Sequence, residues 1–299
     1  MKVLVTGASG MVGRNLVSYF ASKGIGTIPT DLAGWEHSGD LLDKTFVFEG
    51  LASLDFDAII HMAAITEIRK TIEDPNLCFN VNCVGTLNML ELARRKGVSR
   101  ILCTSSANVY GAPSVNPVTE DTPFDPRVPY DYSKVICENL AMSFHKSKGV
   151  PVALTRSWLL FGEYDQPSRA TIRFIRACLK DEPLTLYNGG KDTTSPSHAV
   201  NFAKLALAIL QTEGAEGKSF NFGGERPVSI RELAETVKEL TGSKSRLDLA
   251  PPRSELEATP QISYPSLERV KGVLGYRHEL TLEQGLQRTI DWVKAQPTR

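Results

Sequence analysis

The sequence has no excess of charge of either sign, since 34 lysines and arginines balance 34 aspartates and glutamates in 299 residues. A chain without net charge has no electrostatic basis for binding nucleic acid or an anionic membrane, so neither is expected as a partner. Long hydrophobic runs are also missing: the longest, Ala58–Ile60 and Trp158–Phe161 among them, fall far short of the ~18 residues that span a bilayer. The opening residues MKVLVTG contain no apolar region with a cleavage site, so a secretory signal is not expected.

Cysteine is scarce, and its spacing suggests no pairing. The five cysteines are an odd number without C-x-x-C spacing, at Cys78, Cys83, Cys103, Cys137 and Cys178. This pattern disfavours a disulfide framework or a zinc site and predicts buried thiols in a reducing, cytoplasmic compartment. The five histidines also lack ligand spacing, so no metal is predicted, and His61 and His198 are interpreted as structural.

The composition is that of a globular protein, with 41% hydrophobic and 23% charged residues. Short, β-branched, nearly unbroken apolar runs predict strands at Lys2–Thr6, Asp57–Met62, Arg100–Thr104 and Pro151–Arg156, with a weaker one at Gly26–Asp31. Such runs suit a parallel sheet covered on both faces. Helical patterns lie between them at Met11–Lys23, Asn76–Lys96 and Asp131–Lys148, and a less regular one at Leu41–Leu54. This alternation predicts an α/β fold with a Rossmann-type doubly wound parallel sheet.

The pattern changes after Gly162. Helices are predicted at Ser168–Lys180, His198–Leu210, Ile230–Leu240 and Leu282–Lys294, with Pro- and Gly-rich loops between them and an extended surface loop at Ala250–Pro265. We therefore predict a cofactor-binding domain over residues 1–162 and a smaller, mixed α/β substrate-binding domain over 163–299. The segment 196–223 is expected to return to the first domain, with Ser219–Phe222 as an added strand.

A glycine-rich turn joins the first strand to the first helix. Its glycines allow a tight turn and a close approach of a pyrophosphate, which then lies at the positive helix N-terminus. Asp31 ends the second strand, where a carboxylate can bind both ribose hydroxyls and would repel a 2′-phosphate, so NAD is favoured over NADP. The predicted cofactor contacts in this region are Gly7, Gly10, Met11, Val12, Gly13, Asp31 and Leu32.

A second group of residues carries acid–base chemistry. Tyr130 and Lys134 are one turn apart on a predicted helix, with Ser106 at the end of an earlier strand. A phenol is a poor base near neutral pH, but a nearby ammonium and an oxidised nicotinamide stabilise its phenolate form. Tyr130 could then take a proton from a substrate alcohol as hydride leaves the same carbon, with Ser106 hydrogen-bonded to the substrate oxygen.

Together these residues resemble the extended short-chain dehydrogenase/reductase family, especially its NAD-dependent sugar-nucleotide epimerase branch, which includes UDP-glucose 4-epimerase. The likeness covers nearly the whole chain. Its motifs are T-G-x-x-G-x-x-G (Thr6–Gly13), G-D-L-x-D (Gly39–Asp43), H-M-A-A (His61–Ala64), I-E-D-P (Ile72–Pro75), N-x-x-G-T-x-x-x-L-E (Asn82–Glu91), S-S-x-x-V-Y-G (Ser105–Gly111), Y-x-x-x-K (Tyr130–Lys134), F-N-F-G (Phe220–Gly223) and P-V-S-I-R-E-L (Pro227–Leu233).

The resemblance implies roles for individual residues. Tyr130 would be the base, Lys134 would hold the nicotinamide ribose, and Ser106 would polarise the substrate hydroxyl. Further cofactor contacts would come from Asp40 and Leu41 at the adenine, Met62, Ala63 and Ala64 at the pyrophosphate and ribose, Asn82 from below, and Trp158 near the nicotinamide. A homodimer is also implied, through a four-helix bundle formed by the helices at Asn76–Lys96 and Asp131–Lys148.

Three departures from the family pattern bear on the substrate. The family's dehydratases carry Asp-Glu before V-Y-G, where this chain has Ala107 and Asn108, so a 4,6-dehydratase is disfavoured. Leu159 and Thr194 replace an asparagine and an arginine that commonly contact the substrate diphosphate, and neither can act as a bidentate cation. Residues that could compensate are Arg169, Arg173, Lys191 and Arg253.

These observations favour an NAD-dependent nucleotide-sugar 4-epimerase, which oxidises C4 transiently. Two alternatives remain: an NAD-dependent dehydrogenase or reductase of a keto sugar or small alcohol, and a non-catalytic dinucleotide sensor. Leu159 and Thr194 favour the first alternative. Ser106, Tyr130 and Lys134 together disfavour the second, because a sensor has little need for all three.

Overall fold

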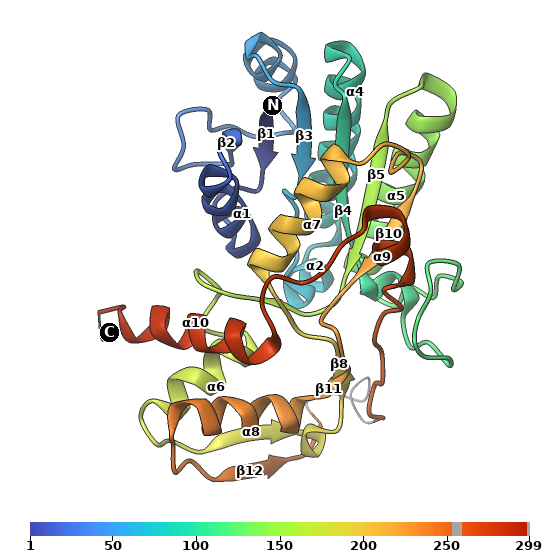
Figure 1. Cartoon of the computed structure of the whole chain (residues 1–299). Coiled ribbons are helices and arrows are strands. Elements are labelled where there is room, and N and C mark those ends of the chain that lie inside the picture. The colour runs from blue at the N-terminus through green and yellow to red at the C-terminus, as the bar shows by residue number, and fades with distance from the viewer. Residues whose placement is uncertain (253–258, 298–299) are drawn as a thin grey trace.

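A single sheet of six parallel strands organises the N-terminal part of the chain (Figure 1). The structure is a computed structural model that describes residues 1–252 and 259–297. The strand order is β10-β5-β4-β3-β1-β2. The strands are β1 (Lys2–Thr6), β2 (Gly26–Thr30), β3 (Ala58–His61), β4 (Arg100–Ser106), β5 (Val152–Ser157) and β10 (Ser219–Phe222). The Rossmann-type sheet is confirmed, and so is the return of Ser219–Phe222, which pairs in parallel with β5.

Helices cover both faces of this sheet because its strands alternate their apolar side chains between the two. Val3 and Val5 of β1 pack with α1 (Met11–Ser22) and α7 (Ala199–Gln211), whereas Leu4 faces the opposite side. That side is covered by α4 (Gly85–Lys96) and α5 (Pro129–Lys148). The central strands β3, β4 and β5 are therefore almost entirely buried, as their continuous apolar sequences predict, whereas the edge strand β2 is only partly buried.

Two predicted helices differ from expectation. The helix at Asn76–Lys96 is divided into α3 (Pro75–Phe79), a π-helical turn η3 (Asn80–Val84) and α4. The helix expected over Leu41–Leu54 is wrong in its first third. The Asp40 side chain accepts a hydrogen bond from the Leu42 nitrogen and forms a turn, and the Asp43 side chain accepts from the Thr45 and Phe46 nitrogens. The helical part therefore begins only at Lys44 and continues through η1 (Phe46–Gly50) and η2 (Leu51–Ser53). The short α2 (Ile68–Glu73) and α9 (Glu268–Leu274) are not predicted.

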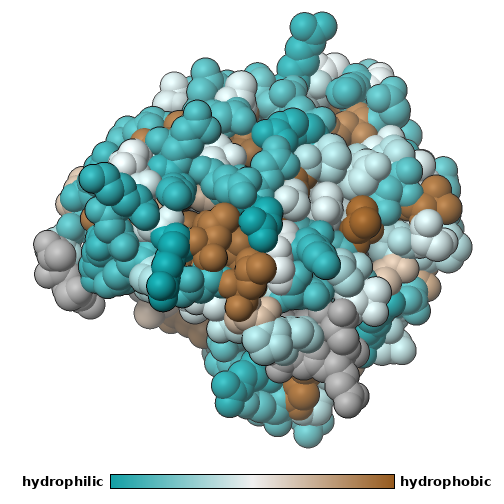
Figure 2. All heavy atoms as spheres, turned by 90° about the horizontal axis from the view of Figure 1, so that it is seen from below, coloured by the Kyte–Doolittle hydropathy of each residue, from teal (hydrophilic) through white to brown (hydrophobic). Residues whose placement is uncertain are grey.

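The C-terminal half has its own apolar core. The amphipathic helices α6 (Ala170–Cys178), α8 (Ile230–Thr241) and α10 (Leu282–Lys294) pack over a parallel pair, β7 (Leu184–Tyr187) and β12 (Leu247–Ala250). The predicted mixed α/β character of this part is confirmed, while the domain boundary at residue 162 stays a prediction. Figure 2 views the molecule from this end and shows a mostly hydrophilic surface with small apolar areas.

Short ladders and turns lie between the sheet and the C-terminal core. They are β6 (Leu160–Phe161) with β9 (Ser197–His198), β8 (Thr193–Thr194) with β11 (Val228–Ser229), and the 3-10 turn η4 (Ala107–Tyr110). The 3-10 turn η5 (Asn188–Gly190) lies in the C-terminal half, against β7, β12 and α8. The predicted loop Ala250–Pro265 is described only in part. Its residues 259–265 lie extended beside Thr193 and Val118, and half of Ile262 is exposed. No helix of the described residues is both long and apolar enough to cross a membrane.

Candidate active site

The glycine-rich turn brings backbone atoms closer together than any side chain would allow. Gly7 has a φ of +72°, and a Cβ atom there would lie 2.7 Å from the Ala63 nitrogen. A Cβ at Gly13 would lie 2.3 Å from the Gly7 carbonyl oxygen. Gly10 is the N-cap of α1 and has no side chain to cover the first N–H groups of the helix, which include those of Met11 and Val12. The turn therefore leaves room for a pyrophosphate at the helix N-terminus.

Asp31 lies beside this turn, as the sequence predicts. Its carboxylate accepts hydrogen bonds from the Ser9 nitrogen at 2.9 Å and the Leu32 nitrogen at 2.8 Å. Each oxygen retains a lone pair for a ribose hydroxyl. The Gly39 nitrogen donates to the Asp31 carbonyl oxygen, which brings the turn containing Asp40 and Leu41 toward the same edge of the sheet. The residues present thus fit NAD.

The segment after β3 forms the next part of the cofactor edge. The Met62 and Ala63 nitrogens both donate to the Thr6 hydroxyl at 3.2 Å, and Ala64 follows. Asn82 is buried: its Oδ1 accepts from the Ile65 nitrogen at 2.8 Å, and its Nδ2 donates to Ser133 Oγ at 2.9 Å. These bonds hold the segment against α5. The structure thus shows Asn82 holding the chain, and a direct contact with the cofactor stays a prediction.

His61 is structural, in agreement with the sequence interpretation. Its Nδ1 lies 2.8 Å from Thr6 Oγ1, and its Nε2 lies 3.0 Å from Thr86 Oγ1. Burial, together with the charge of Lys134, lowers the pKa of His61 to about 3, so the ring is neutral. His198 caps α7 by accepting from the Val200 nitrogen, and its Nε2 lies 3.0 Å from Glu163 Oε2.

Tyr130 and Lys134 lie in the first turns of α5, beside β4, the strand that ends at Ser106. Lys134 Nζ donates to the Thr104 carbonyl oxygen at 2.9 Å and lies 5.9 Å from the centroid of the Tyr130 ring. Ser106 Oγ accepts from the Asn108 nitrogen at 3.2 Å and so caps η4. No hydrogen bond to the Tyr130 hydroxyl is present within residues 1–252 and 259–297, which leaves this group available to a substrate.

Trp158 follows the last residue of β5, whose partner in β4 is Ser106. Its ring stacks on Tyr110 with centroids 5.9 Å apart, and its Nε1 donates to Ser263 Oγ at 3.0 Å. Trp158 is therefore buried in a small cluster beside η4. Its predicted contact with the nicotinamide stays a prediction.

Two of the four cations proposed to compensate for the departures from the family pattern, Arg169 and Arg173, already have partners in the described part of the chain. Leu159 packs against the C-terminal core, and Thr194 pairs with Val228 in the β8–β11 ladder. Among the proposed compensating residues, Arg169 lies 3.8 Å from Asp165 and the Arg173 guanidinium lies over the rings of Phe174 and Tyr187. Lys191 is exposed, and Arg253 lies outside the described residues.

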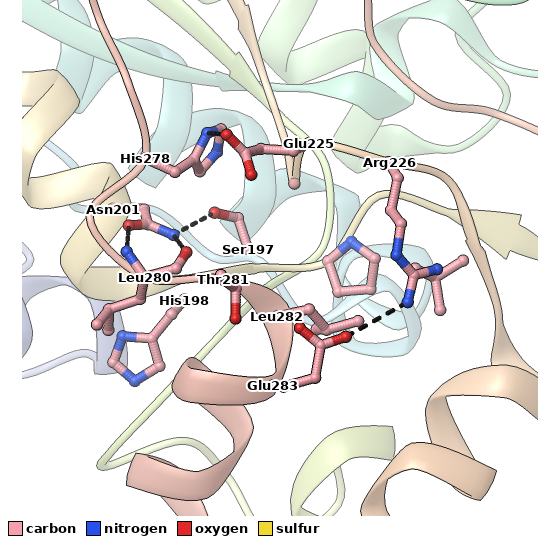
Figure 3. A pocket seen from close by; sticks show the side chains of 13 residues that line it. Ser197, His198, Asn201, Glu225, Arg226, His278, Leu280, Thr281, Leu282 and Glu283 are labelled. Carbon is pink, nitrogen blue, oxygen red and sulfur yellow. Dashed lines mark hydrogen bonds and ion pairs between the residues drawn. The ribbon is translucent and has the colours of Figure 1, made fainter.

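A cavity of about 230 Å³ lies elsewhere, between the start of α7, the segment after β10 and the start of α10 (Figure 3). Ser106, Tyr130 and Lys134 do not line it. Its polar side chains already bond to each other or to backbone: Asn201 Oδ1 accepts from two nitrogens, and Arg226 pairs with Glu232 and Glu283. The cavity therefore lies where these elements meet, and it is separate from the predicted catalytic residues.

Several residues that shape the site were not predicted. The Thr6 hydroxyl, the Thr104 carbonyl oxygen and Ser133 each fix a predicted site residue through contacts between distant parts of the chain. Arg156, which lies buried against Glu138, could have been found from the sequence, because it is the one charged residue in the predicted strand Pro151–Arg156.

The fold and the glycine turn define a Rossmann-type dinucleotide-binding protein. A model of the NAD dependent epimerase/dehydratase family matches residues 3–223, so the chain belongs to this family and its cofactor is NAD. This membership confirms the resemblance to the extended short-chain dehydrogenase/reductases.

Relatives in this family carry out different reactions. The chain is 25% identical to the UDP-glucuronate 4-epimerase of Thermodesulfobacterium geofontis, over 97% of this chain and 95% of the relative. It is 29% identical to UDP-glucuronic acid decarboxylase 1 of Danio rerio, over 97% of this chain and 72% of the relative. The solved UDP-glucose 4-epimerase of Thermus thermophilus in complex with NAD superposes with a TM-score of 0.87, at 26% identity and 99% coverage of both chains.

Proposed function

We propose that this protein is an NAD-dependent epimerase that inverts a nucleotide sugar at C4. The observation that carries the proposal is the placement of Lys134 beside Tyr130, at the end of the strand that bears Ser106. Residues 107 and 108 of this chain are Ala and Asn, so the acid pair of the family's dehydratases is missing from this position. The epimerase among the relatives supports the same reaction class.

In the proposed reaction, Tyr130 acts as the base. As a phenolate, held by the nearby Lys134 ammonium, it takes the proton of the C4 hydroxyl, while Ser106 donates a hydrogen bond to the same oxygen. When bound, NAD would supply a hydride acceptor, and because the keto sugar turns over in the site, the hydride would return to the opposite face of C4. Tyr130 then gives the proton back to the oxygen. No net oxidation results, because the hydride and the proton both return to the sugar.

A second candidate is an NAD-dependent oxidoreductase of a keto sugar or small alcohol. The observation that favours it is the lack of cationic side chains at Leu159, which packs in the C-terminal core, and at Thr194, which lies in the β8–β11 ladder. A screen of nucleotide sugars against free sugars and alcohols separates the two candidates. Turnover of nucleotide sugars alone removes the support for the oxidoreductase.

The first measurement is the NAD and NADH content of the purified protein, released by denaturation and expressed per mole of chain. An epimerase reuses its cofactor within one cycle, so we expect near-stoichiometric NAD. An empty protein that binds added NAD weakly would show that NAD is a co-substrate and would favour the oxidoreductase.

The second measurement is turnover of the variant Tyr130→Phe, with Tyr132→Phe as the matched control on the same helix. Tyr132 is 51% exposed, so its hydroxyl is dispensable. We expect Tyr130→Phe to lower turnover by ~10³-fold and to keep its NAD, because general-base catalysis supplies factors of this size. Full turnover in Tyr130→Phe would rule out the proposed mechanism.

We also propose that two chains associate through α4 and α5. Val84 at the end of η3, Leu87 of α4 and Ile136 of α5 are large apolar residues that are 38–40% exposed, and such residues are candidates for burial between two chains. We expect a solution mass twice the chain mass of 32.8 kDa. The double variant Leu87→Glu, Ile136→Glu should be a monomer that still binds NAD, and a monomeric unmodified protein would contradict the proposal.

A further inference from the structure

A buried ion pair lies behind the predicted catalytic residues and has no direct part in the proposed reaction. Arg156 of β5 and Glu138 of α5 have side-chain exposures of only 7% and 4%. Arg156 Nε lies 3.0 Å and 3.1 Å from the two carboxylate oxygens, and its Nη2 donates to Oε2 at 2.7 Å. One edge of the guanidinium is thus fixed against one helix.

The remaining edge of the guanidinium bonds to the segment that follows Ser106. Arg156 Nη1 donates to the Tyr110 hydroxyl at 2.6 Å and to the Glu120 carbonyl oxygen at 2.8 Å. The Tyr110 hydroxyl in turn donates to Asn221 Oδ1 of β10 at 2.8 Å. Arg156 therefore joins α5, η4 and the outer sheet strand in one network.

Stability alone does not account for such a pair. Burying two charges removes them from water, and replacing a buried pair by apolar residues is often neutral or stabilising. A buried pair can instead select one arrangement of the elements that it joins. The elements joined here are those that carry the reaction: η4 begins after Ser106 and ends at Tyr110, and α5 carries Tyr130 two turns before Glu138.

We propose that Arg156 is a positioning residue that fixes Ser106 relative to Tyr130 through Tyr110 and Glu138. The inference rests on the proposed function, in which Ser106 and Tyr130 both bond to one substrate oxygen. Two groups that meet at one atom must be placed closely, and a shift of ~1 Å at a reacting centre can lower the rate by ~10²-fold. The ring of Trp158 also stacks on Tyr110, which adds an apolar contact to the hydrogen bonds that hold η4.

The test uses Tyr110→Phe in the full-length, NAD-loaded protein. This change removes one hydroxyl from the network and keeps the ring against Trp158. The matched control is Tyr276→Phe, which removes another buried hydroxyl whose single bond goes to the Asn201 carbonyl oxygen at 2.8 Å, away from Ser106. Both variants should have lower melting temperatures, and the fall should be larger for Tyr110→Phe, which loses two hydrogen bonds, one of them from a charged donor.

Only Tyr110→Phe should lower kcat, by ~10-fold with KM changed less than about twofold, when activity is expressed per NAD-loaded chain. Arg156→Lys should lower kcat further, because an ammonium cannot bond to Glu138 and Tyr110 in the same geometry. Equal kcat in Tyr110→Phe and Tyr276→Phe would overturn the inference, since a purely structural role predicts that result.

Crystal structures of the variants distinguish a failure of the positioning role from a failure of the proposed function. The distance from Ser106 Oγ to the Tyr130 hydroxyl should change in Tyr110→Phe and Arg156→Lys and stay unchanged in Tyr276→Phe. An unchanged distance in all three variants overturns the positioning role, even if the protein acts on another alcohol. Lack of turnover on every nucleotide sugar by the unmodified protein would instead overturn the proposed function.

Discussion

The sheet half and the C-terminal half hold their polar groups in different ways. Around the sheet edge, Asn82 and Lys134 are at most 6% exposed, and each bonds to groups from distant segments. In the C-terminal half the pairs Arg226–Glu232 and Arg231–Glu235 have side chains 43–53% exposed. Exposed pairs contribute little to stability. The exposed pairs Arg226–Glu232 and Arg231–Glu235 can therefore change with little effect on stability, whereas the buried hydrogen bonds of Asn82 and Lys134 tie distant segments of the sheet half together.

The largest expected effect is on stability, from the core of the C-terminal half. Leu286 of α10 is fully buried, so Leu286→Ala should lower the free energy of unfolding by about 2–5 kcal/mol, through lost burial and a residual cavity. Leu282→Ala, on the same helix but only partly buried, should cost less. If the sheet half binds NAD independently of the C-terminal half, both variants keep their NAD at 25 °C. Loss of NAD from Leu286→Ala while it remains folded would show that the two halves are coupled.

The second-largest expected effect is on NAD affinity, and it tests the glycine-rich turn. Gly7→Ala would place a Cβ atom 2.7 Å from the Ala63 nitrogen at a φ of +72°. The backbone must shift, and we expect NAD affinity to fall by ~10²-fold because phosphate contacts depend on this geometry. Gly24→Ala is the matched control: Gly24 has nearly the same φ, +71°, but nothing lies within 4 Å of its Cβ position.

Both alanine variants should therefore lose similar stability from backbone strain, about 1–3 kcal/mol. Isothermal titration calorimetry with NAD separates the effect of backbone strain, which both variants share, from the effect of the close contact, which only Gly7→Ala has. Equal NAD affinities in Gly7→Ala and Gly24→Ala would show that the close approach at Gly7 is not needed for the cofactor.

The sheet and its glycine turn could be predicted because they depend on local sequence. Continuous β-branched runs mark buried parallel strands, and the turn glycines directly follow the first strand. The spacing of Tyr130 and Lys134 depends only on the helix period. The late start of the helix after Leu41 was missed because the Asp40 side chain forms a local turn and the Asp43 side chain caps the helix that begins at Lys44.

Contacts across the fold could not be read from the sequence. Asn82 was predicted to touch the cofactor, yet its amide bonds to the chain segment near Ile65 and to Ser133. The hydrogen bond from Lys134 goes to a backbone carbonyl group, which no residue identity reveals. The short β8–β11 and β6–β9 ladders are two residues long in each strand, too short for a periodic signal.

The smallest expected effect is on the pH dependence of stability. It compares His61 in the sheet half with Glu163, which lies between the two halves. Burial lowers the pKa of His61 to about 3, whereas the unfolded chain takes up a proton on this ring near 6.5. The stability due to neutral His61 is thus present above pH 6.5 and falls as the pH drops toward 3. Between about pH 6 and pH 5 the unmodified protein should lose ~1 kcal/mol more than His61→Gln.

Glu163→Gln is the control at the junction of the two halves. Burial alone would raise the pKa of Glu163, but hydrogen bonds from His198 and Arg288 outweigh burial and lower it to about 2. Its contribution is present above its ordinary pKa of about 4.5 and is lost only as the pH falls toward 2. Urea unfolding at about pH 6 and pH 5 should therefore give Glu163→Gln the same pH slope as the unmodified protein. An unchanged slope in His61→Gln would show that His61 is not the group that makes the sheet half sensitive to acid.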